Sequence, residues 1–305
     1  MNSEVFHWFR VRIMKPFFVK KLYYFLVEKI GLFISDLNFL RVVYFLRTRK
    51  FLNVKNPVTF NEKLQWLKLY NRNPILSKLA DKYKVRDFVA KKVGSDILIP
   101  LIGVYDSFDD IDFDKLPDKF ILKCNHASGW NFVCEDKGRL DYKKMKKLFD
   151  FWLKTNYYYH GRSWEYKNIK PKIVCEKFLS QEGTFGLDDY KFHCFNGRPV
   201  YIQYIKNRLK GRTKETYYNT KWKFQPFNMT NCRNTKLVDR PKNLKKMLDI
   251  SKKLSKGLPY ARIDLYNLDG RIYFGEVTLC PANGMDNFDP PKYEKIFGDM
   301  IDINS

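Results

Sequence analysis

The sequence of 305 residues is short of histidine, of closely paired cysteines and of long apolar stretches. Its four histidines do not have the spacing of metal ligands, so a histidine metal centre is not expected. Its six cysteines are scattered, which predicts free thiols in a reducing compartment. Lys15, Lys20 and Lys21 interrupt the apolar residues near the start, so we expect neither a secretory signal nor a membrane-spanning helix.

Acidic residues are also scarce, with 33 Asp and Glu against 57 Lys and Arg and a net charge of +24. A hydrophobic content of 45%, with 17% aromatic residues, is typical of a folded chain and not of a disordered one. The excess charge suits nucleic acid, an anionic membrane surface or an acidic substrate. The aromatic, zinc-knuckle and GXXG signatures of nucleic-acid modules are missing, so no nucleic-acid partner is expected.

Residues 1–55 form a basic region in which eleven Lys and Arg accompany three Asp and Glu. Helical spacing within it places apolar side chains on one side, with Lys20, Lys21, Glu28 and Lys29 on the other. The apolar side could dock on a membrane interface or pack on the rest of the protein, and the sequence leaves both open. The residues of this apolar side are Val19, Leu22, Tyr23, Leu26, Val27, Ile30 and Phe33.

Helices and hairpins alternate along the remaining sequence. Thr59 and Glu62 have the spacing of a capping box and predict the start of a helix. Antiparallel hairpins among the helices predict an α+β (mixed α/β) fold. The other expected elements are helices over 77–93, 141–154 and 241–256, a buried strand over 97–105, an acidic link over 106–118, a strand–loop–strand unit over 120–136, a strand over 172–179, and hairpins over 190–206 and 261–284.

The last hairpin concentrates polar side chains on one sheet face. Arg262 and Asp264 alternate on its first strand, and Glu276 and Thr278 alternate on its second. Two neighbouring carboxylates need a cation between them, which is either Mg²⁺ or Arg262 in a structural ion pair. The opposite, apolar face is predicted to hold Ile263, Leu265, Tyr273 and Val277.

Two further motifs are weaker. Lys123 precedes the small-residue loop of KCNHASGWN, whose backbone amides could approach phosphate oxygens; a plain hairpin loop is the alternative. In EKFL (176–179), a charged pair interrupts the end of an apolar strand, which indicates an exposed edge or a hinge.

In this order the motifs resemble ATP-grasp enzymes, and RIDLYNLDGRIYFGEVTLCPANG is similar to the magnesium-binding hairpin of D-alanine:D-alanine ligases. NPVTFNEKLQWLKLY, LADKYKVRDFV, LKCNHASG, WEYKNIKP, DYKFHCFNG and YFGEVTLCP resemble more closely the TupA-like ATP-grasp family of polysaccharide gene clusters, over about residues 35–303. The resemblance implies two α+β subdomains that grip ATP, with a helical N-terminal extension. It divides the chain into the basic region 1–55, an N-terminal subdomain 56–117, a glycine-loop subdomain 118–180 and a C-terminal subdomain 181–305.

The resemblance also implies ATP and Mg²⁺ as cofactors and gives roles to individual residues. Lys123 is expected to bind the phosphates of ATP, Arg262 to steady phosphate or the intermediate, and Lys191 to contact phosphate or substrate. Two positions depart from the usual pattern, since Thr278 replaces an asparagine and Ala127 a glycine. The loop expected to cover the phosphates is Asn125, His126, Ala127, Ser128 and Gly129; the adenine hinge is Glu176, Lys177, Phe178 and Leu179; the metal ligands are Asp264, Glu276 and Thr278.

The implied activity is ATP-dependent ligation of a carboxylate to an amine through an acyl phosphate, in capsular or other cell-surface polysaccharide biosynthesis. Some family members are labelled glycosyltransferases, so transfer from a nucleotide sugar is the alternative, and Asp110 and Asp112 form the DxD pair it would need. The expected partners are ATP and an acidic sugar, glycan or amino acid. The expected location is cytoplasmic, peripheral at the inner face of a membrane. Residues 157–162 and 208–212 are candidates for substrate contacts.

Overall fold

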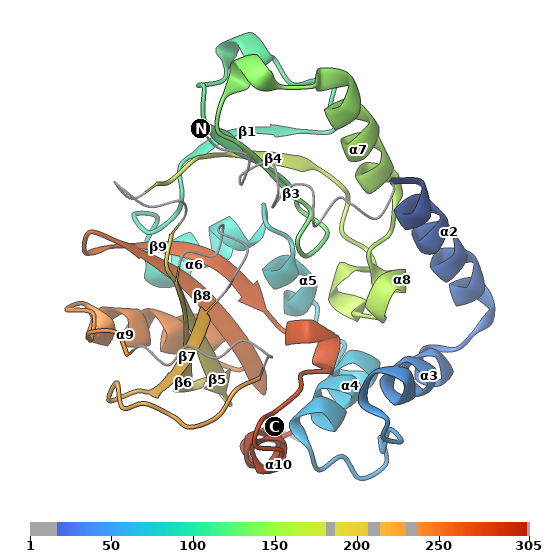
Figure 1. Cartoon of the computed structure of the whole chain (residues 1–305), viewed down its shortest axis with the longest axis vertical. Coiled ribbons are helices and arrows are strands. Elements are labelled where there is room, and N and C mark those ends of the chain that lie inside the picture. Colours follow the sequence, from blue (N-terminus) through green and yellow to red (C-terminus); the bar gives the residue numbers. More distant parts are fainter. Residues whose placement is uncertain (1–16, 181–186, 207–213, 230–236, 304–305) are drawn as a thin grey trace.

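The computed structural model describes residues 17–180, 187–206, 214–229 and 237–303. Its strands form two antiparallel sheets, which lie one above the other in Figure 1. The four-stranded sheet has the order β1-β4-β2-β3 and the five-stranded sheet the order β7-β6-β5-β8-β9. The strands are β1 (Leu101–Tyr105), β2 (Phe120–Cys124), β3 (Asn131–Cys134), β4 (Ile173–Lys177), β5 (Asp189–Phe195), β6 (Arg198–Lys206), β7 (Lys214–Asn219), β8 (Tyr260–Leu268) and β9 (Arg271–Thr278).

Helices surround both sheets (Figure 1). Met145 and Phe149 of α7 join the core of the four-stranded sheet. Met247 and Leu254 of α9 pack on one face of the five-stranded sheet; the other face carries polar residues together with the aromatic residues Phe195, Tyr217 and Tyr260. The helices are α2 (Phe17–Phe33), α3 (Asp36–Thr48), α4 (Phe60–Tyr70), α5 (Ile75–Ala80), α6 (Val85–Val93), α7 (Tyr142–Lys154), α8 (Tyr158–Gly161), α9 (Leu244–Ser255) and α10 (Lys292–Asp299).

Local signals in the sequence account for most of these elements. The capping box is confirmed: Thr59 Oγ1 accepts from Glu62 N at 3.3 Å, and Glu62 Oε2 accepts from Thr59 N at 3.0 Å. The hairpin turns at Asn196-Gly197 and Asp269-Gly270 are confirmed, and all four residues have the positive φ that such turns require. The predicted α+β fold class is therefore confirmed.

Three local predictions are wrong. The helix expected over 77–93 is broken into α5 and α6 because the Asp81 side chain accepts from the backbone amides of Tyr83 and Lys84. The strand expected over 97–105 is shorter, and β1 is a partly exposed edge strand. β4, whose last two residues are the first two of EKFL, is not an exposed edge, because it lies between β1 and β2; the alternative of a hinge at EKFL stays a prediction.

The subdomain boundaries stay a prediction. β1 pairs with β4 although the expected boundary at 117/118 separates them in the chain. One sheet thus draws strands from both sides of the acidic link, where the 3-10 turn Phe113–Lys115 lies.

The predicted N-terminal helix is present as α2, but its apolar side faces outward. Tyr24 packs edge-to-face on Trp130 at 5.6 Å, and the buried Gly31 accepts a hydrogen bond from Arg162 Nη2 at 3.0 Å. Most of the residues predicted for the apolar side are exposed to 45% or more, namely Leu22, Tyr23, Leu26, Ile30 and Phe33. Tyr23 of this side still contacts His160, with its hydroxyl 3.2 Å from Nδ1, so the alternative in which this side packs on the protein holds for that residue and not for Leu22, Leu26, Ile30 and Phe33.

None of the described helices has the length and apolar character needed to cross a membrane.

Candidate active site between the two sheets

The β8–β9 hairpin has the register that the sequence predicts. Arg262 pairs with Thr278 and Asp264 with Glu276, so all four side chains share one sheet face. A bulge follows, because Leu265 pairs with Phe274 and leaves Gly275 as the extra residue. A Cβ at Gly275 would lie 3.0 Å from the Asp264 carbonyl oxygen, so the bulge favours glycine.

The bulge corrects one predicted face. Beyond Gly275 the alternation shifts by one residue, so Phe274 and not Tyr273 enters the apolar core with Ile263, Leu265 and Val277. Tyr273 instead pairs with Tyr266. The four polar residues keep their predicted positions because they precede the shift on one strand and follow it on the other.

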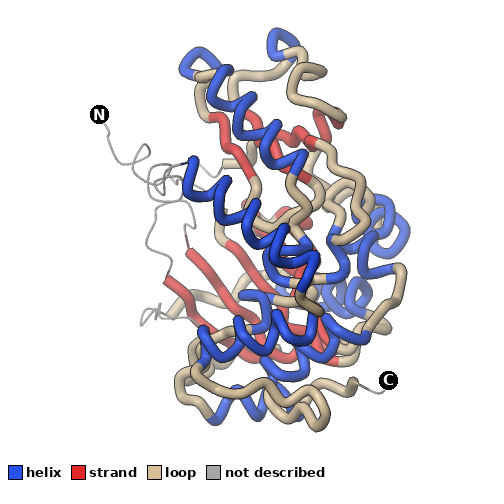
Figure 2. The backbone as a smooth tube through the Cα atoms, turned by 90° about the vertical axis from the view of Figure 1, so that its right-hand side faces the viewer, coloured by secondary structure: helices blue, strands red, loops and turns tan. Residues whose placement is uncertain are grey.

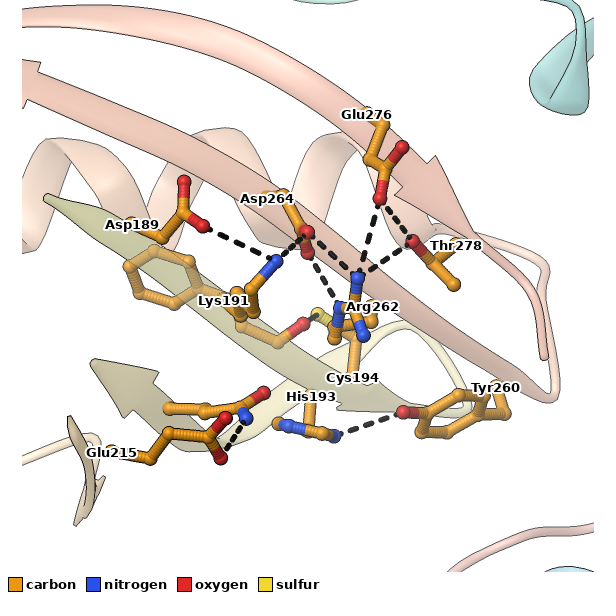
Figure 3. Close-up of polar contacts among 12 residues, drawn as sticks. Asp189, Lys191, His193, Cys194, Glu215, Tyr260, Arg262, Asp264, Glu276 and Thr278 are labelled. Carbon is orange, nitrogen blue, oxygen red and sulfur yellow. Dashed lines mark hydrogen bonds and ion pairs between the residues drawn. The ribbon is translucent and has the colours of Figure 1, made fainter. Parts of the chain in front are cut away.

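Asp264 is the centre of a buried ion network (Figure 3). Its Oδ1 accepts from Arg262 Nε and its Oδ2 from Arg262 Nη2, both at 2.7 Å, a bidentate arrangement. Lys191 lies opposite Asp264 on β5 and its Nζ binds the same Oδ2, while Asp189 Oδ2 lies 3.7 Å from that Nζ. Burial opposes ionisation of Asp264, but Arg262 and Lys191 together outweigh it and hold the carboxyl pKa below its usual range.

Glu276 and Thr278 extend the network toward solvent. Arg262 Nη2 lies 3.3 Å from Glu276 Oε1 and 3.0 Å from Thr278 Oγ1, and the Thr278 hydroxyl donates to Glu276 Oε1 at 3.1 Å. The Glu276 side chain is 34% exposed, compared with 3% for Asp264, so Glu276 is the more accessible carboxylate. Desolvation and Asp264 oppose its ionisation, but Lys191 and Arg262 outweigh them and its pKa is lowered.

These oxygen atoms fit a magnesium ion that arrives with phosphates. Among the residues described, no three His, Cys, Asp or Glu side chains form a metal site by themselves. Mg²⁺ usually takes one or two carboxylates and completes its shell with phosphate oxygens and water. Asp264 and Glu276 supply two carboxylates, and the guanidinium already between them shows that a cation is favoured there.

The four-stranded sheet carries a second ion network, of opposite balance. Glu176 on β4 pairs with Lys123 Nζ of β2 at 2.5 Å and with Arg86 Nη1 of α6 at 3.0 Å. Arg86 Nη2 also donates to the Ile99 carbonyl at 2.9 Å. Lys123 and Glu176, for which the family resemblance implies phosphate and adenine contacts, are therefore in direct contact.

The predicted phosphate loop divides into an anchor and a tip. Asn125 is buried and donates to Asp81 Oδ1 at 3.0 Å, while its Oδ1 accepts from Lys172 N at 2.7 Å. His126 and Ala127 are also buried, and His126 Nε2 lies 3.1 Å from the Trp152 carbonyl. Only Ser128 and Gly129 are exposed, and Gly129 has a φ of +74°. Ligand contacts from this loop would therefore be made at its tip.

The residues of the predicted hinge lie at the end of β4. Lys177 N donates to the Pro100 carbonyl at 3.0 Å, and its side chain is exposed. Phe178 and Leu179 follow and are half-buried.

Lys82 connects the two networks. Its ammonium donates to the Ala127 carbonyl in the phosphate loop. Burial lowers the Lys82 pKa, Glu276 acts to raise it and Lys123 to lower it further, so Lys82 lies close to charges of both sheets. The amide of Phe274 donates to the Ile97 carbonyl at 2.7 Å and joins β9 to the segment that precedes β1.

The two networks thus form one polar centre between the sheets. We call Lys82, Arg86, Lys123 and Glu176 the basic cluster, because its three cations accompany one carboxylate. We call Asp189, Lys191, Arg262, Asp264 and Glu276 the acidic cluster, because its three carboxylates accompany two cations. An excess of positive charge facing an excess of negative charge suits a ligand made of phosphates and a divalent cation.

Comparison with known proteins agrees with this arrangement. The family model described as TupA-like ATPgrasp matches residues 62–302. The chain belongs to the TupA-like ATP-grasp family. The α+β fold with its two antiparallel sheets is thus an ATP-grasp fold, as the sequence predicted. No protein among the curated ones matches the chain.

Several solved structures are similar to the chain at low identity. D-alanine–D-alanine ligase from Bacillus anthracis complexed with ATP is 20% identical, with a TM-score of 0.45, over 74% of this chain and 65% of that chain. The Helicobacter pylori D-alanine–D-alanine ligase is 16% identical, with a TM-score of 0.41, over 80% of this chain and 69% of that one. Phosphoribosylamine–glycine ligase from Thermotoga maritima is 14% identical, with a TM-score of 0.39, over 71% and 54% of the two chains. The chain thus spans less than two thirds of the length of the first and third of these enzymes.

Sequence reasoning missed Lys82 and Arg86 of this family member. Both lie within LADKYKVRDFV, a segment that carries the family resemblance, yet nothing in their local spacing assigns them a role. Only the tertiary structure reveals them. The turn at 81–84 brings Lys82 to the phosphate loop, and α6 brings Arg86 to β4, both more than forty residues later in the chain.

The two guesses for substrate contacts fare differently. Arg162 is fully buried and Tyr158 donates to Asp36 Oδ1 at 2.5 Å, so this part of 157–162 holds α2 and α3 and is a wrong choice for substrate contact. Residues 208–212 lie outside the described residues.

Unpaired polar atoms lie elsewhere on or beside the five-stranded sheet. His193 Nδ1 lies 2.9 Å from the Tyr260 hydroxyl (Figure 3), but its buried Nε2 has no hydrogen-bond partner in the described structure. Asp286 Oδ2 is likewise buried without a partner there, while Asn61 holds the Asp286 backbone at 2.9 and 3.1 Å. Burial and Arg262 lower the His193 pKa to about 3, and burial raises the Asp286 pKa to about 7.

Proposed function

We propose that this protein is an ATP-dependent ligase that joins a carboxylate to an amine. One observation supports the proposal most strongly: Lys82, which donates to the Ala127 carbonyl in the phosphate loop, lies close enough to Glu276 of the acidic cluster and to Lys123 of the basic cluster for both charges to act on its pKa. The phosphates of ATP would lie against Lys82 and Lys123, and the β- and γ-phosphate oxygens would point to Asp264 and Glu276. Mg²⁺ bound there would add positive charge at the phosphate oxygens.

The reaction we propose has two steps. A carboxylate oxygen of the substrate attacks the γ-phosphorus, the bond from that phosphorus to the bridging oxygen of ADP breaks, and an acyl phosphate forms. Lys82, Lys123 and Arg262 stabilise the charge that develops on the phosphoryl oxygens. An amine nitrogen then attacks the acyl carbon, inorganic phosphate leaves, and loss of a proton completes the amide.

We place the acceptor substrate over His193 and Asp286. Buried polar atoms without partners are uncommon in proteins, so a substrate group that supplies the missing hydrogen bonds would bind there favourably. Both residues lie close enough to Arg262 for its charge to shift their pKa values, which places them beside the acidic cluster. A neutral His193 and a carboxyl group suit hydroxyl and amine groups of a sugar or an amino acid.

We further propose a role in cell-surface or capsular polysaccharide biosynthesis, at the cytoplasmic side of a membrane. The sequence resemblance to the TupA-like proteins of polysaccharide gene clusters, together with the family match over residues 62–302, supports the role. The five cysteines in the described ranges are free thiols, which suits a reducing compartment.

Glycosyl transfer has less support. Asp110 Oδ2 accepts from Ser107 N at 2.8 Å, and Asp112 caps a 3-10 turn and pairs with Lys115 at 2.8 Å. The two acids of the DxD pair therefore organise local turns on the surface.

Release of ADP tests the ligase proposal. The protein is supplied with Mg-ATP and with pairs of candidate uronic acids and amino acids, and wild type is compared with Lys123→Ala and Glu276→Gln. We expect substrate-dependent ADP release that both substitutions reduce, while Lys115→Ala, at an 85% exposed position, leaves it unchanged. A wild-type protein that does not bind ATP in calorimetry contradicts the proposal.

A further inference from the structure

The outer surface of α2 and α3 exposes an unusual amount of apolar side chain. Of the twenty large hydrophobic residues that are exposed in the described ranges, twelve lie between residues 22 and 51. Phe33 is 88% exposed and Phe51 is 85% exposed. Figure 2 looks directly at the side of the molecule on which α2 lies in Figure 1, where no other described segment covers this helix. A patch of this size on a protein surface indicates a binding partner.

Helical geometry gathers these residues on one side of each helix. Among residues 21–33 of α2 the buried and half-buried positions are Tyr24, Val27, Glu28 and Gly31, which have the spacing of one face. On α3 the buried positions are Leu40 and Tyr44. The opposite sides expose Leu22, Phe25, Leu26, Ile30 and Phe33 on α2, and Val42, Phe45 and Leu46 on α3. We call these eight residues and Phe51, which stacks on Phe45 at 5.1 Å, the outer apolar surface.

Contacts with the rest of the protein fix the orientation of this surface. Arg162 lies between the two helices, where Nη2 donates to the Gly31 carbonyl at 3.0 Å and Nη1 lies 3.5 Å from Asp36. Its guanidinium also lies 4.7 Å from the ring centre of Phe39. A buried arginine with these partners resists rotation of α2, so the apolar side is held outward in the folded protein.

The charge around the outer apolar surface identifies its partner. The exposed basic residues there are Lys21, Lys29, Arg41, Arg47, Arg49 and Lys50, and the acids of the same two helices are Glu28 and Asp36. A second copy of the chain would bring two positive surfaces together, which is unfavourable. Anionic lipid headgroups complement the basic residues, and the acyl region beneath them accepts the aromatic and aliphatic side chains.

We propose that the outer apolar surface is a docking site for an anionic lipid bilayer. α2 lies along the interface with Phe25 and Phe33 inserted below the headgroups, while Lys21, Lys29 and Arg41 contact lipid phosphates. Because Tyr24 packs on Trp130 directly after the phosphate loop, the docked helix lies next to the candidate active site. The proposal rests on the surface alone and does not depend on the ligase activity.

Sedimentation with vesicles tests the proposal on the full chain. Vesicles of equal parts phosphatidylglycerol and phosphatidylcholine are compared with vesicles of phosphatidylcholine alone. We expect the protein to sediment with the anionic vesicles and to be released by salt. The triple substitution Lys21→Gln, Lys29→Gln and Arg41→Gln should weaken binding by roughly a hundredfold, at about fivefold for each charge.

The apolar contribution is tested by Phe25→Ser with Phe33→Ser. Both positions are exposed, so the fold should survive, and we expect binding to the anionic vesicles to be lost. Phe224→Ser with Leu237→Ser, at exposed positions outside α2 and α3, is the matched control and should bind as wild type does. Calorimetric ATP binding without vesicles should be the same in all variants, which separates this test from that of the proposed function.

Two results would overturn the proposal. One is a wild-type protein that does not sediment with anionic vesicles, or sediments equally after Phe25→Ser with Phe33→Ser. The other is a wild-type dimer in solution that these two substitutions convert to a monomer, because a second copy would then occupy the surface.

Discussion

The basic and acidic clusters are built in different ways, although they face each other. Every member of the acidic cluster lies on β5, β8 or β9, so the register of one sheet places all five side chains on one face. The basic cluster collects Lys82 from a turn, Arg86 from a helix, and Lys123 and Glu176 from two strands. The acidic cluster needs only the pairing of neighbouring strands in one sheet, even though Lys191 and Asp264 are 73 residues apart, whereas the basic cluster needs a turn, a helix and a sheet to pack together.

Substitution of Asp264, a deeply buried residue of the acidic cluster, should lower the stability of the fold more than substitution of Glu276. Asp264→Asn leaves Arg262 and Lys191 buried without their shared carboxylate, and we expect the free energy of unfolding to fall by about 3–5 kcal/mol. Urea unfolding measures it. Glu276→Gln removes a carboxylate that is 34% exposed and should cost much less stability. Similar losses for the two variants would contradict the assignment of Asp264 as the centre of the network.

The outermost carboxylate should matter more for activity than for folding. We expect Glu276→Gln to lower the rate of ADP release by about 10²–10³-fold, the usual effect of removing one preorganised electrostatic contact in an active site. Thr278→Asn, which introduces the residue more usual among ATP-grasp ligases, should keep most of the activity. Steady-state rates of ADP release at saturating Mg-ATP measure both effects. A Thr278→Asn variant as slow as Glu276→Gln would show that asparagine cannot replace Thr278 in this protein.

Lys82 and Lys123 of the basic cluster should both contribute to the affinity for ATP. Lys82→Ala and Lys123→Ala should each weaken ATP binding by roughly tenfold to a hundredfold, because each removes a charged hydrogen-bond donor worth about 1.5–3 kcal/mol. Calorimetry with ATP measures the dissociation constants, with Lys115→Ala as the surface control. If Lys82→Ala binds as wild type does, then Lys82 only supports the Ala127 carbonyl and the cluster is smaller than proposed.

The last expected effect is a pH dependence of stability that arises from Asp286, beside the acidic cluster. Its folded-state pKa of about 7 lies above the ordinary value of 3.8, so between these pH values the folded protein holds a proton that the unfolded chain has lost. Wild-type stability should therefore contain a component that falls as pH rises from about 4 to about 7. Asp286→Asn should lack that component, which melting temperatures across this range would show. An unchanged pH profile would place the Asp286 carboxyl in water.

The sequence determined the parts that rest on short-range rules. Strand alternation and the Asp269-Gly270 turn placed Arg262, Asp264, Glu276 and Thr278 on one face, and the pairing is confirmed. The capping box at Thr59 is confirmed because both of its hydrogen bonds form within one turn. The bulge at Gly275 was not predicted, because its only sequence signal is a single glycine within a strand.

Tertiary structure alone decided which side of α2 faces outward and which residues surround Glu176. Helical spacing shows that α2 has an apolar side. The side that packs on the protein is nevertheless that of Tyr24 and Gly31, because these residues contact Trp130 and Arg162, more than a hundred residues later in the chain. In the same way Arg86 meets Glu176 across ninety residues of chain. Local periodicity fixes directions within one element, whereas contacts between elements depend on how all of them pack together.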